Sequence, residues 1–333
     1  MEKIAILGMG PIGASIGLAL KNVGLKNTQV VGFASSKSDR NAIGKMSAFD
    51  HIESNMKSVV SEAQLVLIDA TVSRTREILE LISEFVEPGA VVTDTCTSKV
   101  RTAAWAKEFL PQGVSYVGGR PIIKSKLEGI SSSHYELLQG ARYCVMPSDT
   151  ADDQATKTVV GMVEAIGAQP YFLDPSEHDI YSSAVDILPS VISAAFVDTT
   201  ANSDSWSEMY KVAGEYFESQ SEMSSEDPVD AETNCLTLSD PLVYWIDQMI
   251  LSLHKFRTYL NEDNDDLVDS FVSAWEQRAK WEIGALGKEQ SGPRLPSAGE
   301  TMATSFLGDK LAKRLIYLED KEKRASWKYP RNR

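Results

Sequence analysis

The stretch Lys3-Ile4-Ala5-Ile6-Leu7-Gly8-Met9-Gly10-Pro11-Ile12-Gly13 joins a short apolar run to a Gly-x-Gly-x-x-Gly motif. The apolar run has the length and composition of a buried β-strand. Residues 12–23, which follow, have the apolar spacing of an amphipathic helix. A glycine motif placed between a strand and a helix is the arrangement that binds a dinucleotide in a Rossmann-type fold.

Each glycine of the motif has its own structural task. Gly8 permits the tight turn after the strand, Gly10 lets the backbone approach a pyrophosphate, and Gly13 lets the helix pack closely on the strand. The N–H groups at the start of the helix then face the phosphates. We therefore expect a dinucleotide cofactor to contact Gly8, Gly10, Pro11, Ile12 and Gly13.

The first half of the chain repeats this alternation of strand and helix. Apolar runs of strand length occur at Lys3–Leu7, Gln29–Phe33, Leu65–Ile68, Ala90–Thr93, Ser115–Val117, Arg142–Met146 and Gln169–Leu173. Helical patterns lie between them, at Ile12–Val23, Ser38–Met46, Arg74–Phe85, Lys99–Phe109 and Asp152–Ile166. The alternation predicts an α/β fold, a doubly wound parallel sheet covered by helices on both faces.

After about Pro175 the strand patterns nearly vanish. Long helical patterns follow at Glu177–Thr199, Ser205–Ser221, Pro241–Leu260, Asp265–Leu286 and Ser297–Lys323, with a loop near Gly292–Pro296. We therefore expect an NAD(P)-binding Rossmann domain over residues 1–175 and an all-helical substrate and dimerisation domain over residues 176–333. A helical half without a sheet needs apolar partners, so we expect a homodimer. Ser219–Thr233 is expected to be a mobile loop, either a lid or a plain solvated connection.

The end of the second strand indicates which dinucleotide is bound. An NAD site has an acidic residue there, which accepts hydrogen bonds from the ribose hydroxyls, but this chain has Ala34. Ser35, Ser36, Lys37 and Arg40 follow, and their hydroxyls and positive charges suit a 2′-phosphate. The same residues are also those of an ordinary polar turn before a helix. We favour NADP over NAD.

The composition is that of a folded protein with an acidic surface. Apolar residues make up 43% and charged residues 24%, and the formal net charge is −14. A phosphate backbone repels such a surface, so nucleic acid is not expected as a partner. The tail Lys310–Arg333 is basic, but its bases interleave with acids, and a nucleic-acid role for it is the weakest reading.

The sequence also indicates a soluble cytoplasmic protein without a resident metal. Cys96, Cys144 and Cys235 are too few and too scattered for a disulfide framework or a zinc site. The N-terminus runs straight into the first strand and leaves no room for a signal peptide. The most apolar later stretch, Ala184–Val197, is interrupted by an Asp and a Pro and is too short to span a bilayer.

Several motifs in order resemble the prephenate/arogenate dehydrogenase family. They are Gly8–Gly17, Asp94-Thr-Cys-Thr-Ser-Lys99, Gly118-Gly-Arg-Pro121, Glu177-His-Asp179 and Ile187-Leu-Pro189, which together cover about residues 1–200. The resemblance implies an NAD(P)-binding Rossmann domain followed by a helical domain that dimerises. It also implies oxidation of a cyclohexadienol, with decarboxylation, on the path to tyrosine.

The chain departs from the family at residues that carry the chemistry. Thr97 replaces a serine near the nicotinamide and substrate, which keeps a hydroxyl at that position. Arg120 stands where the family has its catalytic histidine, and Arg cannot accept a proton near neutral pH. The Ser-His-Leu-Pro-His pattern becomes 186–190, Asp-Ile-Leu-Pro-Ser, and the family's substrate-binding arginine segment is missing. We therefore expect hydride transfer to or from a small acidic hydroxy, keto or imino substrate that is not prephenate.

The first group of candidate residues lies where the helical half begins. His178 precedes Asp179 at the start of a long helix, and the pair matches a His-Asp pair that the family has near its active site. Helix capping and proton transfer are both consistent with that position. Asp186 lies farther along the same helix in an apolar stretch, where a carboxylate must be paired or functional.

The second group is basic and follows the strand at Ser115–Val117. Arg120, Lys124 and Lys126 are expected to form an anion site, although plain loop cations are an equal alternative. Arg120 and Lys124 are expected to hold the substrate's carboxylate, with Ser125 and Asp179 beside it. We place the nicotinamide near Thr97 and expect Thr71 to contact the cofactor as well. Lys124, His178 or Asp186 is expected to handle the proton.

Two other functions remain open on the sequence alone. One is a genuine prephenate or arogenate dehydrogenase with relocated catalytic groups. The other is a non-catalytic regulatory protein that binds NADP and has lost turnover. The sequence leaves the identity of the substrate and the direction of the reaction open.

Overall fold

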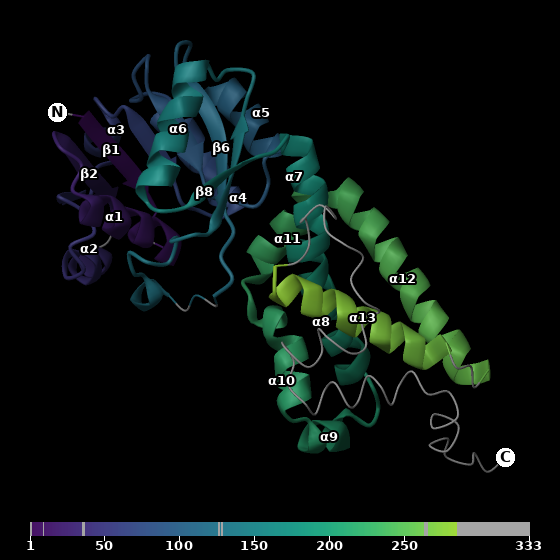
Figure 1. Cartoon of the computed structure of the whole chain (residues 1–333). Helices are drawn as coiled ribbons and strands as arrows, with labels where there is room; N and C mark the ends of the chain where they lie inside the picture. The colour runs from purple at the N-terminus through teal and green to yellow at the C-terminus, as the bar shows by residue number, and fades with distance from the viewer. Residues whose placement is uncertain are drawn as a thin grey trace. The chain divides into compact units, whose positions relative to one another are not determined.

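A computed structural model describes residues 2–284 of the chain, apart from residues 9, 35, 36, 126, 128 and 263–265 (Figure 1). The predicted cofactor residues Ser35 and Ser36, the predicted anion-site residue Lys126, the loop near residues 292–296 and the helix 297–323 lie outside the described residues. The structure falls into two compact units, which divide between Leu253 and His254.

One sheet of eight strands, in the order β3-β2-β1-β4-β5-β6-β7-β8, forms the centre of the first unit. The strands are β1 Glu2–Leu7, β2 Thr28–Phe33, β3 His51–Glu53, β4 Leu65–Ile68, β5 Val91–Asp94, β6 Ser115–Pro121, β7 Arg142–Pro147 and β8 Gln169–Phe172. Every neighbouring pair is parallel except β6 and β7, which are antiparallel. The doubly wound α/β fold is therefore confirmed.

Two details of the sheet differ from the sequence prediction. Strand β7 runs antiparallel to β6 because the described part of their connection holds only a 3₁₀ turn, Ile130–Ser132, and no α-helix. A parallel return needs a crossover, usually a helix, to carry the chain back. Strand β3 was missed because it has only three residues, of which His51 and Glu53 are exposed polar groups.

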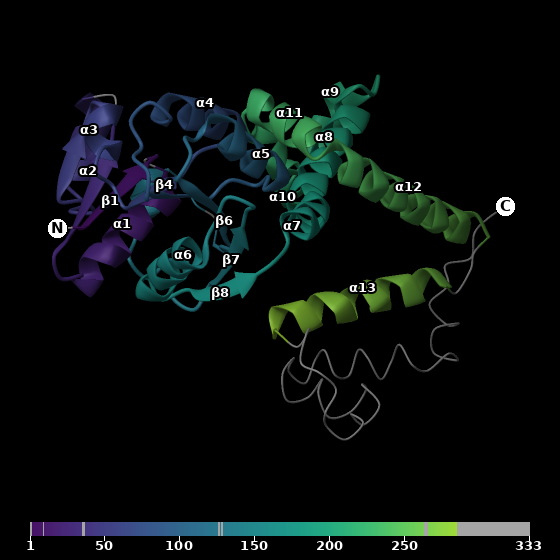
Figure 2. The same cartoon turned by 90° about the horizontal axis from the view of Figure 1, so that it is seen from above.

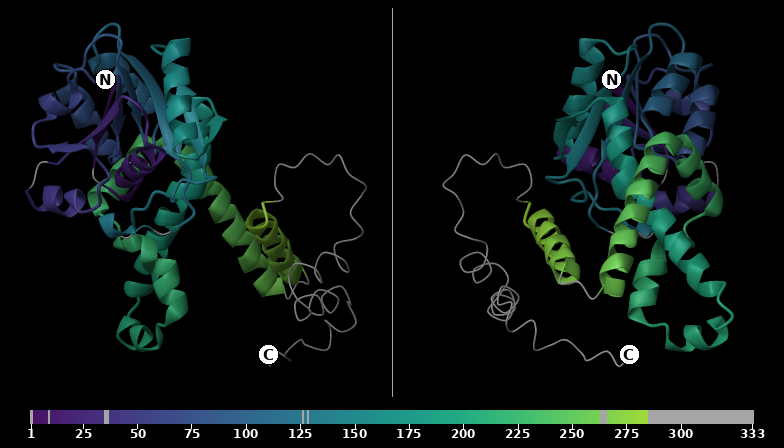
Figure 3. Two further views of the ribbon diagram at one scale, coloured as in Figure 1. Left: turned by 60° about the vertical axis from the view of Figure 1, so that its left-hand side comes forward. Right: turned by 90° about the vertical axis from the view of Figure 1, so that its right-hand side faces the viewer.

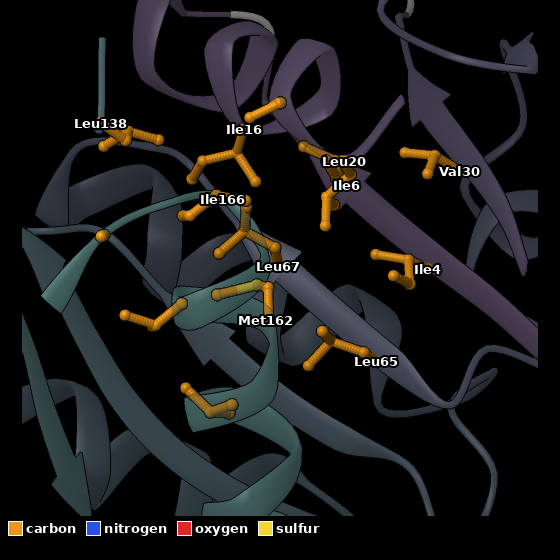
Figure 4. Packing of buried hydrophobic residues seen from close by; sticks show 14 of the residues in the cluster. Ile4, Ile6, Ile16, Leu20, Val30, Leu65, Leu67, Leu138, Met162 and Ile166 are labelled. Carbon is orange, nitrogen blue, oxygen red and sulfur yellow. The ribbon is translucent and has the colours of Figure 1, made fainter. Parts of the chain in front are cut away.

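Helices cover both faces of the sheet, as predicted (Figure 2). They are α1 Pro11–Val23, α2 Lys37–Gly44, α3 Met56–Val60, α4 Val72–Ile82, α5 Val100–Phe109 and α6 Asp153–Ala165. Alternate residues of β1 serve the two faces. Ile4 and Ile6 pack with Ile16 of α1 and Met162 of α6 (Figure 4), whereas Ala5 and Leu7 belong to a second core under α3, α4 and α5.

The helices after β8 are drawn in teal to yellow-green in Figure 3. They are α7 Pro175–Ser182, a π-helical turn η2 Ser183–Ile187, α8 Leu188–Ala201, α9 Trp206–Met209, a 3₁₀ turn Tyr210–Val212, α10 Glu215–Ser221, a 3₁₀ turn Glu222–Ser225, α11 Pro228–Thr237, α12 Ser239–Glu262 and α13 Asp266–Glu282. The expectation of a loop over 219–233 is wrong, because α11 begins inside that stretch. The Asp227 carboxylate caps it by accepting from the N–H groups of Val229 and Asp230.

The run α7–η2–α8 is continuous from Pro175 to Ala201, which is 27 residues. By length and composition it could cross a membrane, so the expectation that this apolar stretch is too short is wrong. The buried core helix of a soluble protein passes the same test. This run places His178 and Asp179 in the interior, and Leu188 packs with Leu238 and Leu242 in a core of the helical part.

Candidate functional site

The glycine motif lies where β1 gives way to α1. Gly8 has a φ of +129°, a conformation that favours glycine, and Gly10 precedes the helix with no side-chain cap. Pro11 occupies the first turn, where its missing N–H is no loss. A Cβ on Gly8 would lie 1.8 Å from the backbone oxygen of Asp69, so no other residue fits there. The backbone therefore has the turn and the uncapped helix N-terminus that a dinucleotide phosphate requires.

Asp69, at the carboxyl end of β4, lies against this motif and was missed from the sequence. The Gly13 N–H donates to its Oδ2 over 2.7 Å, and the Thr95 hydroxyl donates to its Oδ1 over 2.6 Å. Burial raises the pKa of Asp69, and these two hydrogen bonds act against that shift. The available signal was a single acid directly after the buried apolar strand β4.

A cavity of about 630 Å³ opens beside the motif. The ends of three adjacent strands line it through Leu7 and Gly8, Phe33 and Ala34, and Ala70 and Thr71. Asp227 and Asp230, from the start of α11, also line it. In a Rossmann fold the adenosine ribose lies at the end of the second strand, so the cavity fits that half of a dinucleotide.

The predicted 2′-phosphate residues lie in part at the same strand end. Arg40 Nη1 donates to the backbone oxygen of Ala34 over 3.0 Å, which places the guanidinium beside the end of β2. Lys37 begins α2, but its side chain is outside the described residues, as are Ser35 and Ser36. Thr71, which was expected to contact the cofactor, is exposed on the cavity wall.

A buried ion pair joins the end of β5 to the start of α5. Lys99 Nζ lies 2.5 Å from Asp94 Oδ2, and the two side chains are 1% and 0% exposed. Lys99 also donates to the Gly119 oxygen over 2.7 Å, and the Tyr116 hydroxyl donates to Asp94 Oδ1 over 2.7 Å. Burial, with the Asp94 charge, raises the pKa of Cys96 to about 12. This network anchors the loop that carries Thr97.

Asp179 links α7 to that loop. Its carboxylate accepts the N–H groups of Lys99 and Val100, over 2.8 and 3.0 Å, and so caps the start of α5. His178 Nδ1 lies 3.0 Å from Asp179 Oδ1, and both residues are buried. Burial lowers the pKa of His178, while its hydrogen bond to Asp179 acts to raise it. The Asp179 oxygens therefore already have protein donors.

Arg120 forms the second link between the sheet and the helical part. Its Nη2 lies 3.1 Å from Asp186 Oδ2, and its Nη1 donates to Ser182 Oγ over 2.5 Å. Ser182 Oγ in turn donates to Asp186 Oδ2 over 2.9 Å. Arg120 is 12% exposed and Asp186 is 37% exposed, so the carboxylate is the more accessible of the two.

The other predicted residues surround this cluster unevenly. Arg120 Nη1 lies 3.5 Å from the Thr97 oxygen, and the Thr97 hydroxyl donates to Asn234 Oδ1 over 3.0 Å. Lys124 and Ser125 lie on the exposed loop after β6. The structure therefore brings Thr97, Arg120 and Asp186 together, with His178 and Asp179 packed behind Thr97's loop. Among residues 2–284, with the gaps given above, no group of His, Cys, Asp or Glu is placed to hold a metal ion.

Ser182 and Asn234 were not found from the sequence. Ser182 lies four residues before Asp186 on the same helical run, a spacing that puts the two on one face, and this was the available signal. Asn234 lies 137 residues from Thr97, and nothing in the sequence connects them.

Two family models match the chain in order. The model described as prephenate dehydrogenase, nucleotide-binding domain, matches residues 16–172, and the model described as prephenate dehydrogenase, dimerization domain, matches residues 174–273. The prephenate dehydrogenase of Bacillus subtilis is 27% identical over 280 residues, which are 83% of this chain and 75% of that protein. The prephenate dehydrogenase of Lactococcus lactis is 26% identical over 202 residues, 59% of this chain and 53% of that protein.

Solved structures share the fold. The prephenate dehydrogenase from A. aeolicus, in complex with hydroxyphenyl propionate and NAD+, superposes with a TM-score of 0.76 at 21% identity, covering 84% of this chain and 98% of that one. The arogenate dehydrogenase of Synechocystis gives a TM-score of 0.69 at 20% identity, covering 84% and 99%. The resemblance drawn from the sequence motifs is therefore confirmed over both halves of the chain.

Proposed function

This chain belongs to the prephenate dehydrogenase family of NAD(P)-dependent oxidoreductases, and we propose that it uses NADP to oxidise or reduce a small anionic substrate other than prephenate. The single observation that carries the proposal is the Arg120–Asp186 ion pair. By the resemblance of the Gly118–Pro121 motif, Arg120 of this pair stands where the family has a catalytic histidine, and a guanidinium cannot take up a proton near neutral pH.

Arg120 and Asp186 have complementary tasks in this proposal. Arg120 binds the anionic group of the substrate, since its fork of N–H groups exceeds what Asp186 and Ser182 together accept. Asp186 takes the proton from the substrate hydroxyl, because it is the more exposed partner and Ser182 holds one of its oxygens. Lys124, on the adjacent loop, adds positive charge.

The remaining residues position these groups. The nicotinamide, when bound, supplies the hydride chemistry. Thr97 would lie near it on a loop that the buried Asp94–Lys99 pair anchors. Asn234 Oδ1 accepts a hydrogen bond from the Thr97 hydroxyl and so fixes the direction of its O–H. Asp179 and His178 hold the start of α5 and, with it, the Thr97 loop. We assign the proton to Asp186 rather than His178 because His178 is buried beside Asp179.

The preference for NADP rests on the end of β2. Ala34 stands where an NAD site has an acid, and the Arg40 guanidinium lies at that strand end with Lys37 one turn before it. Ser35 and Ser36 complete the proposed 2′-phosphate site. Gly8, Gly10, Pro11, Ile12, Gly13 and Thr71 are the proposed contacts to the rest of the cofactor.

We also propose a cytoplasmic homodimer with domains at 1–175 and 176–333. The dimerization-domain match over residues 174–273 supports the pairing and the boundary. Val243, Ile250, Leu251 and Leu253 of α12 are more than half exposed in the single chain, and a second subunit would cover them. The helical run 175–201 contains Asp179 and Asp186, and both carboxylates have partners within the protein. These partners support packing of the run against protein rather than lipid.

The experiment is a panel of hydroxy, keto and imino acids assayed with NADP and NAD. We expect turnover with a small acidic substrate, and a KM that rises at least about tenfold in Arg120→Gln, since a charge-assisted hydrogen bond contributes about 1.5–3 kcal/mol. Arg76→Gln, which changes an exposed arginine on α4, is the matched control. An unchanged KM in Arg120→Gln would remove Arg120 from the substrate site.

A second candidate is a genuine prephenate or arogenate dehydrogenase with relocated catalytic groups. The observation that favours it is the match of both family models, in order, over most of the chain. Prephenate-dependent or arogenate-dependent reduction of NADP would establish it.

A further inference from the structure

The Asp69 carboxylate lies at the N-terminus of α1, where the cofactor's diphosphate is expected. We propose that Asp69 controls dinucleotide affinity: its ionised carboxylate opposes the diphosphate, and the nucleotide binds together with one proton on Asp69. The inference rests on the assignment of the glycine motif as the nucleotide site. It goes beyond that assignment by naming a residue that limits binding.

Asp69 lies beside Gly10, the glycine that the diphosphate is expected to approach. The second glycine of the motif is bare so that a pyrophosphate can approach the backbone. In this chain a Cβ on Gly10 would point at Asp69 Oδ2, 3.1 Å away. A phosphate that approaches Gly10 from that side therefore meets a carboxylate oxygen at close range.

The Asp69 carboxylate already accepts a hydrogen bond from one of the N–H groups at the start of α1. Gly13 N–H donates to Asp69 Oδ2 over 2.7 Å, and a Cβ on Gly13 would lie 2.8 Å from that oxygen. The N-terminus of α1 thus holds one negative charge supplied by the chain itself. Its attraction for a second anion is correspondingly reduced, because the helix dipole amounts to about half an elementary charge.

Among the described residues, no cation pairs with Asp69, and only its hydrogen bonds from Thr95 and Gly13 oppose the effect of burial on its pKa. The described first turn of α1 has no acidic residue, and the basic residue of this helix, Lys21, is in its last turn. On the sheet side, the charges of Asp94 and Asp69 both raise the pKa of the Tyr143 phenol on β7, and the cation there, Lys99, pairs with Asp94 over 2.5 Å. On α4, Arg74 lines the adjacent cavity but pairs with Glu77 over 2.6 Å.

A proton on Asp69 removes the repulsion between its carboxylate and the diphosphate. The neutral carboxyl keeps one oxygen as an acceptor for Gly13 N–H or the Thr95 hydroxyl and gains an O–H that can donate to a phosphate oxygen. Burial already raises the pKa of Asp69 in the free protein, and a nearby diphosphate would raise it further. Above the pKa that Asp69 has in the nucleotide-free protein, nucleotide affinity then falls as pH rises, by up to about tenfold per pH unit.

The test is calorimetric titration of the full chain with NAD+, whose diphosphate keeps its charge through neutral pH. Asp69→Asn is the informative variant, because the amide retains an acceptor and a donor and removes the charge. Asp152→Asn is the matched control, since Asp152 also accepts an N–H at a helix start, from Ala155 of α6, away from the glycine motif. Titrations in two buffers of different ionisation enthalpy report the protons taken up.

We expect Asp69→Asn to bind NAD+ at least about tenfold more tightly than the unaltered chain at about pH 8, with a Kd independent of pH. The unaltered chain and Asp152→Asn should weaken together from about pH 6 to about pH 8.5 and take up as much as one proton per nucleotide. If Asp69→Asn does not fold, this pH dependence and proton uptake of the unaltered chain carry the test alone.

The outcomes separate this inference from the proposed function. Equal Kd values for the unaltered chain and Asp69→Asn, or a pH-independent Kd of the unaltered chain without proton uptake, overturn the inference and leave the nucleotide site intact. Binding by Asp69→Asn alone supports the inference and argues that the unaltered chain is not a working dehydrogenase. No binding of NAD+ or NADP by either protein overturns both.

Discussion

The guanidinium of Arg120 lies 3.1 Å from the carboxylate of Asp186 and joins the end of β6 to the π-helical turn between α7 and α8. Ser182 hydrogen-bonds both partners, so the three side chains form one closed polar cluster. π-Helical turns inside α-helices occur often at functional sites. Here the turn presents Asp186 to Arg120 across the boundary between the sheet and the helices.

The Arg120–Asp186 pair should be energetically coupled. In a double-mutant cycle with Arg120→Gln and Asp186→Asn, we expect a coupling free energy of about 0.5–3 kcal/mol, from urea unfolding. The double change should destabilise the chain by less than the sum of the two single changes, because each single change leaves one charge without its partner. Strictly additive effects would show that the two charges do not interact in solution.

The glycine at position 13 should be required for stability. Gly13→Ala places a Cβ 2.8 Å from both Asp69 Oδ2 and the Gly8 oxygen, and we expect a loss of about 1–3 kcal/mol in the free energy of unfolding. Gly161→Ala is the matched control, since Gly161 lies in α6 and a Cβ added there meets open space. That change should stabilise the chain by up to about 1 kcal/mol. Similar effects of the two changes in thermal unfolding would contradict the packing described for the motif.

His178 should make stability depend on pH below neutrality. Burial lowers its pKa in the folded chain, so the unfolded chain binds the proton more readily. The contribution of neutral His178 to the free energy of unfolding is therefore complete above the ordinary histidine pKa of about 6.5. It is lost as pH falls below that value, by up to about 1.4 kcal/mol per pH unit. His178→Asn should remove this part of the pH dependence of urea unfolding, whereas His51→Gln, on the exposed end of β3, should keep it. An identical pH profile in His178→Asn would exclude the effect.

Arg40 should determine the choice between NADP and NAD. Its guanidinium lies at the end of β2, where a 2′-phosphate would be bound. In fluorescence titrations we expect Arg40→Gln to weaken NADP binding about tenfold or more while changing NAD binding by less than about threefold. An equal change for both nucleotides would place Arg40 outside the 2′-phosphate site.

The periodic parts of the fold could be predicted from the sequence because each strand or helix carries its own apolar pattern. Strands such as Leu65–Ile68 are apolar throughout, and the glycine motif identifies the first crossover by itself. The direction of β7 has no such local signal, because an antiparallel strand on a covered sheet is as apolar as a parallel one. It depends on the connection from β6, which holds no helix among its described residues.

The contacts of the candidate site were harder to predict because they join residues far apart in the chain. The sequence indicated Arg120 and Asp186 separately, but their pairing depends on where β6 and η2 meet. The sequence assigned Asp179 to the substrate, yet the Asp179 carboxylate caps the start of α5. It accepts from the N–H groups of Lys99 and Val100, which lie 80 and 79 positions before it in the chain. A buried charge such as that of Lys99 needs a partner. This rule predicts that a partner exists but does not say which residue it is.

The proposal that the substrate is not prephenate is tested most directly by the reaction of the intact chain with prephenate and NADP, at protein concentrations high enough to detect a single turnover. An authentic prephenate dehydrogenase serves as the positive control. We expect NADP to bind and NADPH to form at less than about 1/100 of the control rate. General acid–base catalysis contributes about 10²–10⁴-fold, and Arg120, which the motif places at the family's histidine position, cannot supply it; the proposed base, Asp186, lies on a different element. Prephenate-dependent NADPH formation within about tenfold of the control rate would show that the chain is a prephenate dehydrogenase despite Arg120.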